Sequence, residues 1–108
     1  MTKTWKHACA ASKLSEEEPL GVKLDEQCVA LYKVNEQIFA TDDVCSHAFA
    51  LLSGGFLDGH VIECPLHGAM FDVRSGKCQS GTYEDIRAFE VEIRDGEIYV
   101  NLDGEGAE

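Results

Sequence analysis

Two runs of alternating apolar and polar residues lie near the C-terminus, and only Asp95-Gly96 separates them. In residues 89–94 and 97–102, apolar side chains occupy every second position. A period of two is typical of β-strands with one buried face, and an Asp-Gly pair accepts the positive φ angles of a tight hairpin turn. An antiparallel hairpin is therefore predicted at this end of the chain.

A second hairpin is predicted around Asn35-Glu36, where residues 28–34 and 37–41 show similar alternation. Its expected interior positions are Val29, Leu31, Ile38 and Ala40. Helical spacing of apolar residues is nearly absent, and one turn over residues 13–19, capped by Ser15, is the single helical candidate. That segment is interpreted as a connector, so the chain is predicted to be all-β.

Size and charge narrow the classes of function. The chain has 108 residues, which fits a single domain. Its net charge is −11, from nine Lys and Arg against twenty Asp and Glu. An acidic excess of this size disfavours nucleic acid and anionic membrane surfaces as partners, because both would repel the chain.

The cysteines are five in number, and their spacing is uneven. They are Cys9, Cys28, Cys45, Cys64 and Cys78. No apolar run follows the first basic residues as a secretory signal requires, and no segment is long enough to cross a bilayer. We therefore expect a cytoplasmic protein, in which thiolate or metal chemistry takes precedence over disulfides.

The conspicuous chemistry falls within residues 43–83, where short apolar pieces lie among loops punctuated by glycine. The single domain, residues 1–108, is therefore predicted to have two parts. A β base is formed by residues 1–42 and 84–108, and residues 43–83 form a loop-rich insertion.

Two loops of the insertion each offer one thiolate and one imidazole. Cys45-Ser46-His47 is followed, sixteen residues later, by Cys64-Pro65-Leu66-His67. Two Cys and two His could hold a tetrahedral zinc ion, but zinc sites usually group like ligands in Cys-x2-4-Cys and His-x3-5-His pairs. If the site instead holds two irons bridged by sulfide, each loop can give its Cys to one iron and its His to the other.

The pattern Cys45-x-His47-x16-Cys64-x2-His67-Gly68 resembles the ligand signature of Rieske 2Fe-2S proteins. The similarity continues through Gly59, residues 61–64 and residues 67–77. The resemblance implies one 2Fe-2S cluster, with Cys45 and Cys64 on the inner iron and His47 and His67 on the outer iron. It also implies the Rieske fold, an antiparallel β-sandwich or barrel base carrying a loop-rich cluster-binding subdomain.

The surroundings of the cluster indicate a low reduction potential for this family. High-potential Rieske proteins carry a disulfide and hydroxyl donors at positions that correspond here to Ala50, Leu66, Ala69 and Phe71. Without those donors the reduced, more negative cluster is less stabilised. Related proteins also cover the cluster with a loop that contains proline. Here residues 78–83 would have to provide this cover, and they contain no proline.

The ferredoxin components of bacterial aromatic-ring-hydroxylating dioxygenase systems are the most similar members. The resemblance implies a monomeric electron carrier with no catalysis of its own. Its partners would be a flavin-dependent ferredoxin reductase and a terminal Rieske oxygenase. Two alternatives stay open: a small Rieske-like subunit of another redox complex such as nitrite reductase, and a zinc-stabilised interaction module.

The other cysteines and histidines are not expected to take part in the cluster site. Cys9, Cys28 and Cys78 are expected to be small buried or half-buried side chains, and His7 and His60 to be structural or exposed. Apolar residues around the proposed ligands, among them Phe49, Leu51 and Leu66, suggest a tip on which both partners dock in turn.

Overall fold

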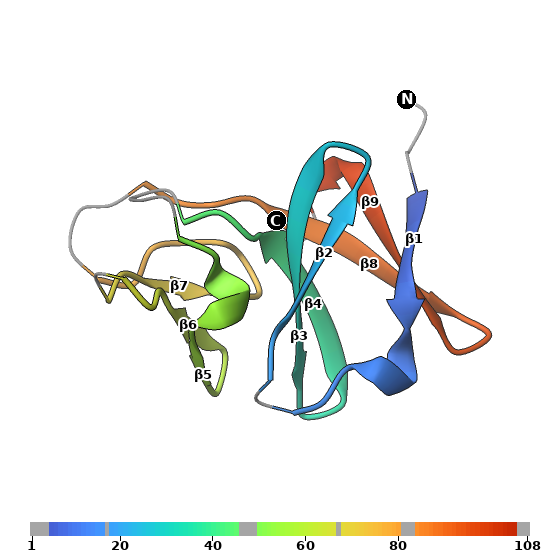
Figure 1. Ribbon diagram of the computed structural model, residues 1–108, viewed down its shortest axis with the longest axis horizontal. Helices are drawn as coiled ribbons and strands as arrows, with labels where there is room; N and C mark the ends of the chain where they lie inside the picture. The colour runs from blue at the N-terminus through green and yellow to red at the C-terminus, as the bar shows by residue number, and fades with distance from the viewer. Residues whose placement is uncertain (1–4, 17, 46–49, 67, 81–83, 106–108) are drawn as a thin grey trace.

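Antiparallel strands account for nearly all the regular structure, and the described residues contain no α-helix. The computed structural model describes residues 5–16, 18–45, 50–66, 68–80 and 84–105, with side chains up to residue 102. Two short 3-10 turns, η1 (Ala11–Lys13) and η2 (Leu52–Gly54), complete the elements (Figure 1). The predicted all-β fold is confirmed.

The larger sheet has six strands, all antiparallel, and nearly closes into a barrel. Its first strand, β1, contacts its last strand, β2, across the opening. In spatial order the strands are β1 (Trp5–Ala10), β9 (Glu97–Glu105), β8 (Ala88–Arg94), β4 (Gln37–Asp42), β3 (Gln27–Val34) and β2 (Leu20–Leu24).

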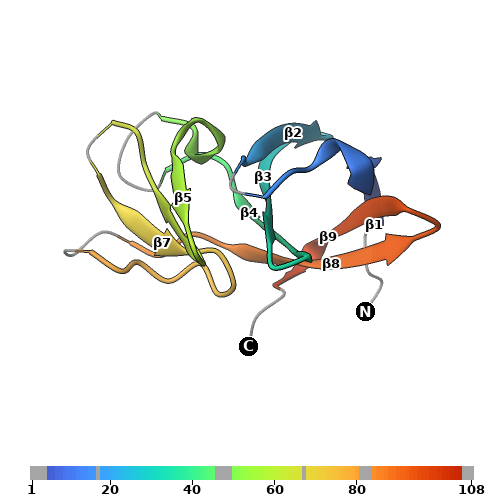
Figure 2. The same cartoon turned by 90° about the horizontal axis from the view of Figure 1, so that it is seen from below.

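The smaller sheet has three short strands and lies at one end of the long axis of the molecule, beside the barrel (Figures 1 and 2). They are β5 (Phe56–Asp58), β6 (Val61–Glu63) and β7 (Met70–Asp72). The chain enters this region after β4 and leaves it before β8, so the smaller sheet is built from one continuous stretch of sequence.

Both predicted hairpins are present, and their turns have the backbone that their sequences favour. Asp95 and Gly96 have φ of 51° and 78°, and Asn35 and Glu36 have φ of 51° and 67°. Positive φ at both central residues matches the right-handed twist of the flanking strands. Glu36 carries a strained backbone in this position, because a Cβ atom disfavours positive φ.

Replacement of Glu36 by glycine is therefore expected to stabilise the protein by about 0.5–1 kcal/mol, measured by urea unfolding. The backbone N–H of Glu36, which donates to the Glu16 carboxylate at 2.9 Å, is kept in this variant. Glu26→Gly is the matched control, since Glu26 lies in the β2–β3 turn without positive φ. If Glu36→Gly destabilises the protein as much as Glu26→Gly does, the strain argument is wrong.

Strand β3 is buried on both faces and joins two cores. Val29 and Leu31 point into the barrel, where Ala40 and the flanking Ile38 also pack, as the sequence predicted. The alternate residues Ala30 and Tyr32 face the smaller sheet. The barrel and the smaller sheet therefore share β3 as a common wall.

Three local details differ from the sequence prediction. The helical turn lies at Ala11–Lys13 rather than after Ser15, and Ser15 instead forms an isolated β-bridge with Glu18. Strands β2 and β5 were not predicted. As expected, this segment connects two elements, since η1 ends at Lys13 and β2 begins at Leu20.

Candidate metal centre

Cys45 and Cys64 each stand at the start of a loop that is closed in the same way. The Cys45 N–H donates to the carbonyl of Ala50 at 2.9 Å, and the Cys64 N–H donates to the carbonyl of Ala69 at 2.7 Å. Each acceptor lies five residues after its cysteine. We call residues 45–50 the first ligand loop and residues 64–69 the second ligand loop.

The two cysteines meet in one apolar core. Their exposed fractions are 3% for Cys45 and 1% for Cys64, and both pack in the cluster of buried residues between β3 and the smaller sheet. Phe71 and Leu52 belong to the same cluster and are fully buried. Two thiols are thus held together out of water, although nineteen positions separate them in the sequence.

The two histidines of the predicted ligand set, His47 and His67, lie outside the described residues. Their assignment as ligands therefore stays a prediction. Among the residues that are described, no three His, Cys, Asp or Glu side chains gather into a site for a metal ion. The structure therefore brings together the cysteine half of the predicted site.

Strands fix the ends of the second ligand loop. Cys64 follows β6, Ala69 precedes β7, and Ile62 pairs with Phe71 between them. The N–H of Gly68 also donates to the Cys64 carbonyl at 3.2 Å, and Gly68 has φ of 77°, a region that glycine enters without strain.

Asp43 fixes the start of the first ligand loop. Its N–H donates to the Cys28 carbonyl at 3.0 Å, and its own carbonyl accepts from Leu52 N–H at 2.6 Å. The carboxylate of Asp43, only 3% exposed, accepts from the N–H and the hydroxyl of Ser53 at 2.7 and 3.0 Å. Sequence reasoning did not single out Asp43 or Ser53, and the position of Asp43 two residues before Cys45 was the only signal for it.

Residues 78–80 run beside β7, next to the second ligand loop. Gln79 N–H donates to the Met70 carbonyl at 2.6 Å, and Met70 N–H donates to the Ser80 hydroxyl oxygen at 2.9 Å. The Cys78 thiol is half-buried and donates to the Ser80 carbonyl at 3.0 Å. Cys78 thus has a local structural role, as expected, and residues 81–83 of the predicted covering loop lie outside the described part of the chain.

The donor set of this region fits an iron–sulfur cluster. Thiolates are the ligands that such clusters take from proteins, and the two thiols here lie in the same buried apolar cluster of residues. Ala69 and Phe71 belong to the same cluster, are fully buried and offer no side-chain hydroxyl. When bound, such a cluster accepts and releases one electron.

The remaining histidines are engaged elsewhere. His7 Nε2 lies 2.6 Å from a Glu97 carboxylate oxygen, and its ring meets Tyr99 edge-on. His60 meets the Phe39 ring edge-on at 5.7 Å between centroids. Both agree with the structural roles expected for them.

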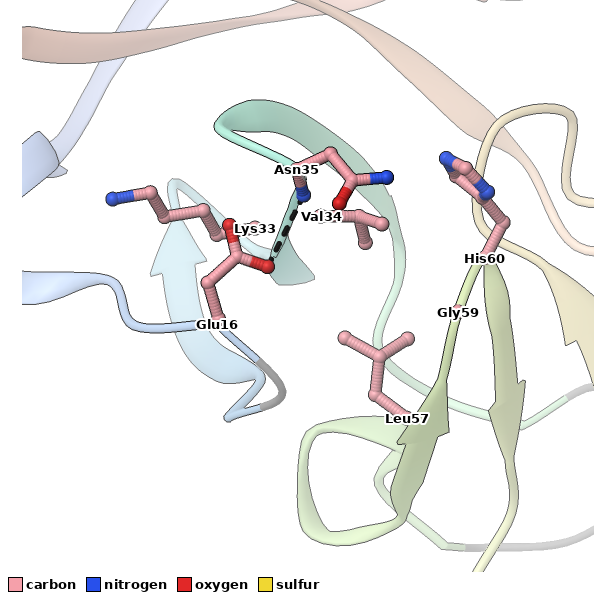
Figure 3. A pocket seen from close by; sticks show the side chains of 7 residues that line it. All are labelled: Glu16, Lys33, Val34, Asn35, Leu57, Gly59 and His60. Carbon is pink, nitrogen blue, oxygen red and sulfur yellow. Dashed lines mark hydrogen bonds between the residues drawn. The ribbon is translucent and has the colours of Figure 1, made fainter.

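A small pocket lies beside His60, and neither Cys45 nor Cys64 is among the residues that line it (Figure 3). Glu16 borders it on one side and Leu57 and His60 on the other. The Glu16 carboxylate is already used, because it accepts the N–H groups of Asn35 and Glu36 at 3.1 and 2.9 Å. The pocket therefore lies between the β3–β4 turn and the smaller sheet, and we assign it no part in the candidate centre.

Exposed apolar side chains collect around the ligand loops. Of the six large hydrophobic side chains exposed in the described part of the chain, five lie within residues 44–70 and only Ile93 lies in the barrel. The five are Val44, Leu51, Phe56, Leu66 and Met70. The predicted apolar tip is thus present at Leu51 and Leu66, whereas Phe49 lies outside the described residues and Ala69 is buried.

The model of the Rieske [2Fe-2S] domain family matches residues 4–90, so this chain belongs to that family. Within the family, it is similar over nearly its whole length to ferredoxins. The ferredoxin component of the naphthalene 1,2-dioxygenase/salicylate 5-hydroxylase systems of Ralstonia sp is 39% identical over 105 residues, covering 95% of this chain and 100% of that protein.

Solved structures agree with this placement. The Sphingomonas yanoikuyae B1 ferredoxin superposes with a TM-score of 0.86 at 31% identity, covering 92% of this chain and 99% of that one. A chain from the complex of reduced oxygenase and oxidized ferredoxin in carbazole 1,9a-dioxygenase gives 0.84 at 40% identity, with 96% of both chains covered. Among the described residues, no helix is long and apolar enough to span a membrane.

Proposed function

We propose that this chain is a Rieske ferredoxin that carries single electrons within a ring-hydroxylating dioxygenase system and catalyses no reaction itself. The observation that carries the proposal is the meeting of Cys45 and Cys64 in one buried core, each at the start of a similarly closed loop. The ferredoxin relatives, named as components of dioxygenase systems, support the same role.

In the proposed site, Cys45 and Cys64 hold the inner iron of one 2Fe-2S cluster, and His47 and His67 hold the outer iron. The buried core around the thiols excludes water from the inner side. The β6–β7 pairing holds the ends of the second ligand loop, and the Asp43 contacts hold the start of the first, so each cysteine is fixed in place before a cluster binds.

The proposed partners are a flavin-dependent ferredoxin reductase and a terminal Rieske oxygenase. A structural relative is found in a complex of oxygenase and ferredoxin. The apolar side chains that surround the ligand loops here provide a surface for transient docking, and the charge of −11 steers the protein toward basic partners.

Leu66→Asp and Leu51→Asp are expected to slow electron transfer to both partners by about tenfold, because each places a charge in the desolvated centre of the docking surface. Leu66 is 55% exposed and Leu51 is 52% exposed, so neither change disturbs the core. The rates are measured by stopped-flow absorbance with the reductase and oxygenase of a dioxygenase system that the wild-type protein serves.

Ile93→Asp is the control, since Ile93 is 47% exposed on the barrel, far along the chain from the ligand loops. Its rates are expected to equal those of the wild type. Equal rates for Leu66→Asp and wild type with both partners would exclude the shared docking surface, and slowing with only one partner would show that the two partners use different surfaces.

Further proposals concern the compartment of the protein, its oligomeric state and the division of the chain into two parts. A monomeric, cytoplasmic carrier is proposed, and the five cysteines, which form no disulfide, suit the reducing compartment that it would occupy. The division into a base, residues 1–42 and 84–108, and a cluster-binding insertion, residues 43–83, is supported by the separate core of the smaller sheet.

The alternatives are less favoured. A nitrite-reductase type of small subunit fits less well, because the relatives that match over nearly the whole chain are ferredoxin components of dioxygenase systems. A zinc-stabilised module would need the same four ligands, and metal analysis separates it from the cluster at once.

A further inference from the structure

Asp43 is a buried carboxylate whose side chain lies on the same side of the chain as the Cys45 thiol. Asp43 and Cys45 are each 3% exposed, whereas Val44 between them is 41% exposed and pairs with Leu51. The burial pattern shows that the Asp43 and Cys45 side chains are both turned inward, and Cα atoms two residues apart are separated by at most roughly 7 Å. The carboxylate therefore faces inward beside the proposed ligand.

Two hydrogen bonds from Ser53 hold the carboxyl group of Asp43 in place. Both carboxylate oxygens act as acceptors, Oδ1 from the Ser53 N–H at 2.7 Å and Oδ2 from the Ser53 hydroxyl at 3.0 Å. No Lys, Arg or His among the described residues forms an ion pair with it. In the part of the chain that the structure describes, Ser53 therefore supplies the contacts that hold this carboxylate.

The neighbouring strand is shaped around this pair. A Cβ atom on Gly21 of β2 would lie 2.7 Å from both the Asp43 carboxylate and the Ser53 hydroxyl. The absence of a side chain at this position lets the backbone of β2 close over the carboxylate. The fold therefore leaves room for the Asp43–Ser53 pair next to the first ligand loop.

The charge acts on the core that holds the cysteines. Burial raises the pKa of the Tyr32 phenol above its ordinary value, and the Asp43 carboxylate contributes further to the rise. Tyr32 packs in the same buried cluster as Cys45 and Cys64. Charges act over a longer range in a buried apolar core than in water, so a group bound at these thiols lies in a medium that transmits the effect of a nearby charge.

We propose that the Asp43 carboxylate, held in place by Ser53, is a fixed negative charge that lowers the reduction potential of the cluster bound at Cys45. The inference rests on the proposed function. Reduction adds one electron to the cluster, and a buried negative charge nearby opposes that addition. Asp43 therefore works with the missing hydroxyl donors to keep this ferredoxin at the low end of its family's range of potentials.

The test compares Asp43→Asn with Ser53→Ala by redox titration of the cluster-loaded proteins. Asp43→Asn removes the charge and keeps the shape, so a positive shift of the potential is expected. Ser53→Ala removes a hydrogen bond that neutralises part of the charge, so the potential is expected to stay level or to fall. Glu26→Gln, an exposed acid in the β2–β3 turn, is the control for net charge and is expected to shift the potential less than Asp43→Asn.

A loosened loop would admit water and raise the reduction potential in both variants. A charge effect raises the potential in Asp43→Asn and does not raise it in Ser53→Ala. A rise in both variants, or no rise in Asp43→Asn beyond that of Glu26→Gln, would overturn the proposal. If Asp43→Asn fails to retain iron, the reduction potential of the Ser53→Ala variant is the test. A potential above that of the wild type would then overturn the proposal. Failure of the proposed function is seen separately, as a wild-type protein without a cluster.

Discussion

Cys45→Ser and Cys64→Ser are each expected to yield protein that is almost free of iron and has lost its visible absorbance. Each thiol is one of the two buried ligands proposed for the inner iron, and serine offers a far weaker ligand in the same space. The loss should be nearly complete in either variant, since one remaining thiolate cannot hold the cluster from the inner side. Iron and acid-labile sulfide are counted per chain, and the absorbance spectrum is recorded on the same samples.

Cys28→Ser provides the matched control for the loss of a thiol. Cys28 is half-buried in β3, and it contributes its carbonyl, not its thiol, to the support of Asp43. Its serine variant is expected to retain iron and sulfide at the wild-type level. Full iron content in Cys64→Ser, or equal loss in Cys28→Ser, would contradict the ligand assignment.

Gly76→Ala is expected to destabilise the fold by about 3 kcal/mol or more, equivalent to a fall in melting temperature of roughly 12 °C. Gly76 is buried with φ of 80°, and a Cβ atom there would overlap the carbonyl oxygen of Ile86. That carbonyl belongs to the segment that returns to β8, and Ile86 N–H donates to the Gly76 carbonyl at 2.9 Å. Because both sides of the contact are backbone, neither can move aside cheaply.

Gly59→Ala separates the steric overlap from the backbone strain. Gly59 has φ of 61°, but nothing lies within 4 Å of the position of its Cβ atom. Its alanine variant should therefore lose only about 1 kcal/mol, the cost of positive φ alone. Thermal unfolding followed by circular dichroism measures both variants, and equal losses in the two would show that the close approach of residues 76 and 86 is not what limits this position.

The hairpins could be predicted because their turns carry local information. Asp95-Gly96 and Asn35-Glu36 determine the backbone at two points, and the alternation beside them selects the buried face. The double burial of β3 could not be predicted in this way. Its second face consists of residues such as Ala30 and Tyr32, whose burial depends on a sheet formed some thirty residues later.

Strands β2 and β5 were missed for a similar reason. β5 has three residues, and β2 has five, of which Gly21 has a low β-propensity although Leu20, Val22 and Leu24 alternate with Gly21 and Lys23. Both strands are held by pairing with neighbours that the local sequence does not specify, because tertiary contacts outweigh the weak β-propensity of short segments.

The structure places two of the four candidate ligands, and the ligand set as a whole stays a prediction. The spacing of Cys45 and Cys64 suggested that distant loops meet, and the two thiols do share one core. His47 and His67 stay predictions, since they lie outside the described residues. Asp43 could not be singled out from sequence, because one acid among twenty gives no sign that it is buried.

The most direct test of the central claim is the low-temperature electron paramagnetic resonance spectrum of the dithionite-reduced wild-type protein, with iron and sulfide counted on the same sample. The account predicts two irons per chain and a rhombic 2Fe-2S signal with the low average g value that histidine ligation produces. A colourless protein that contains zinc and gives no signal would contradict it, and the ligand loops would then form a structural metal site.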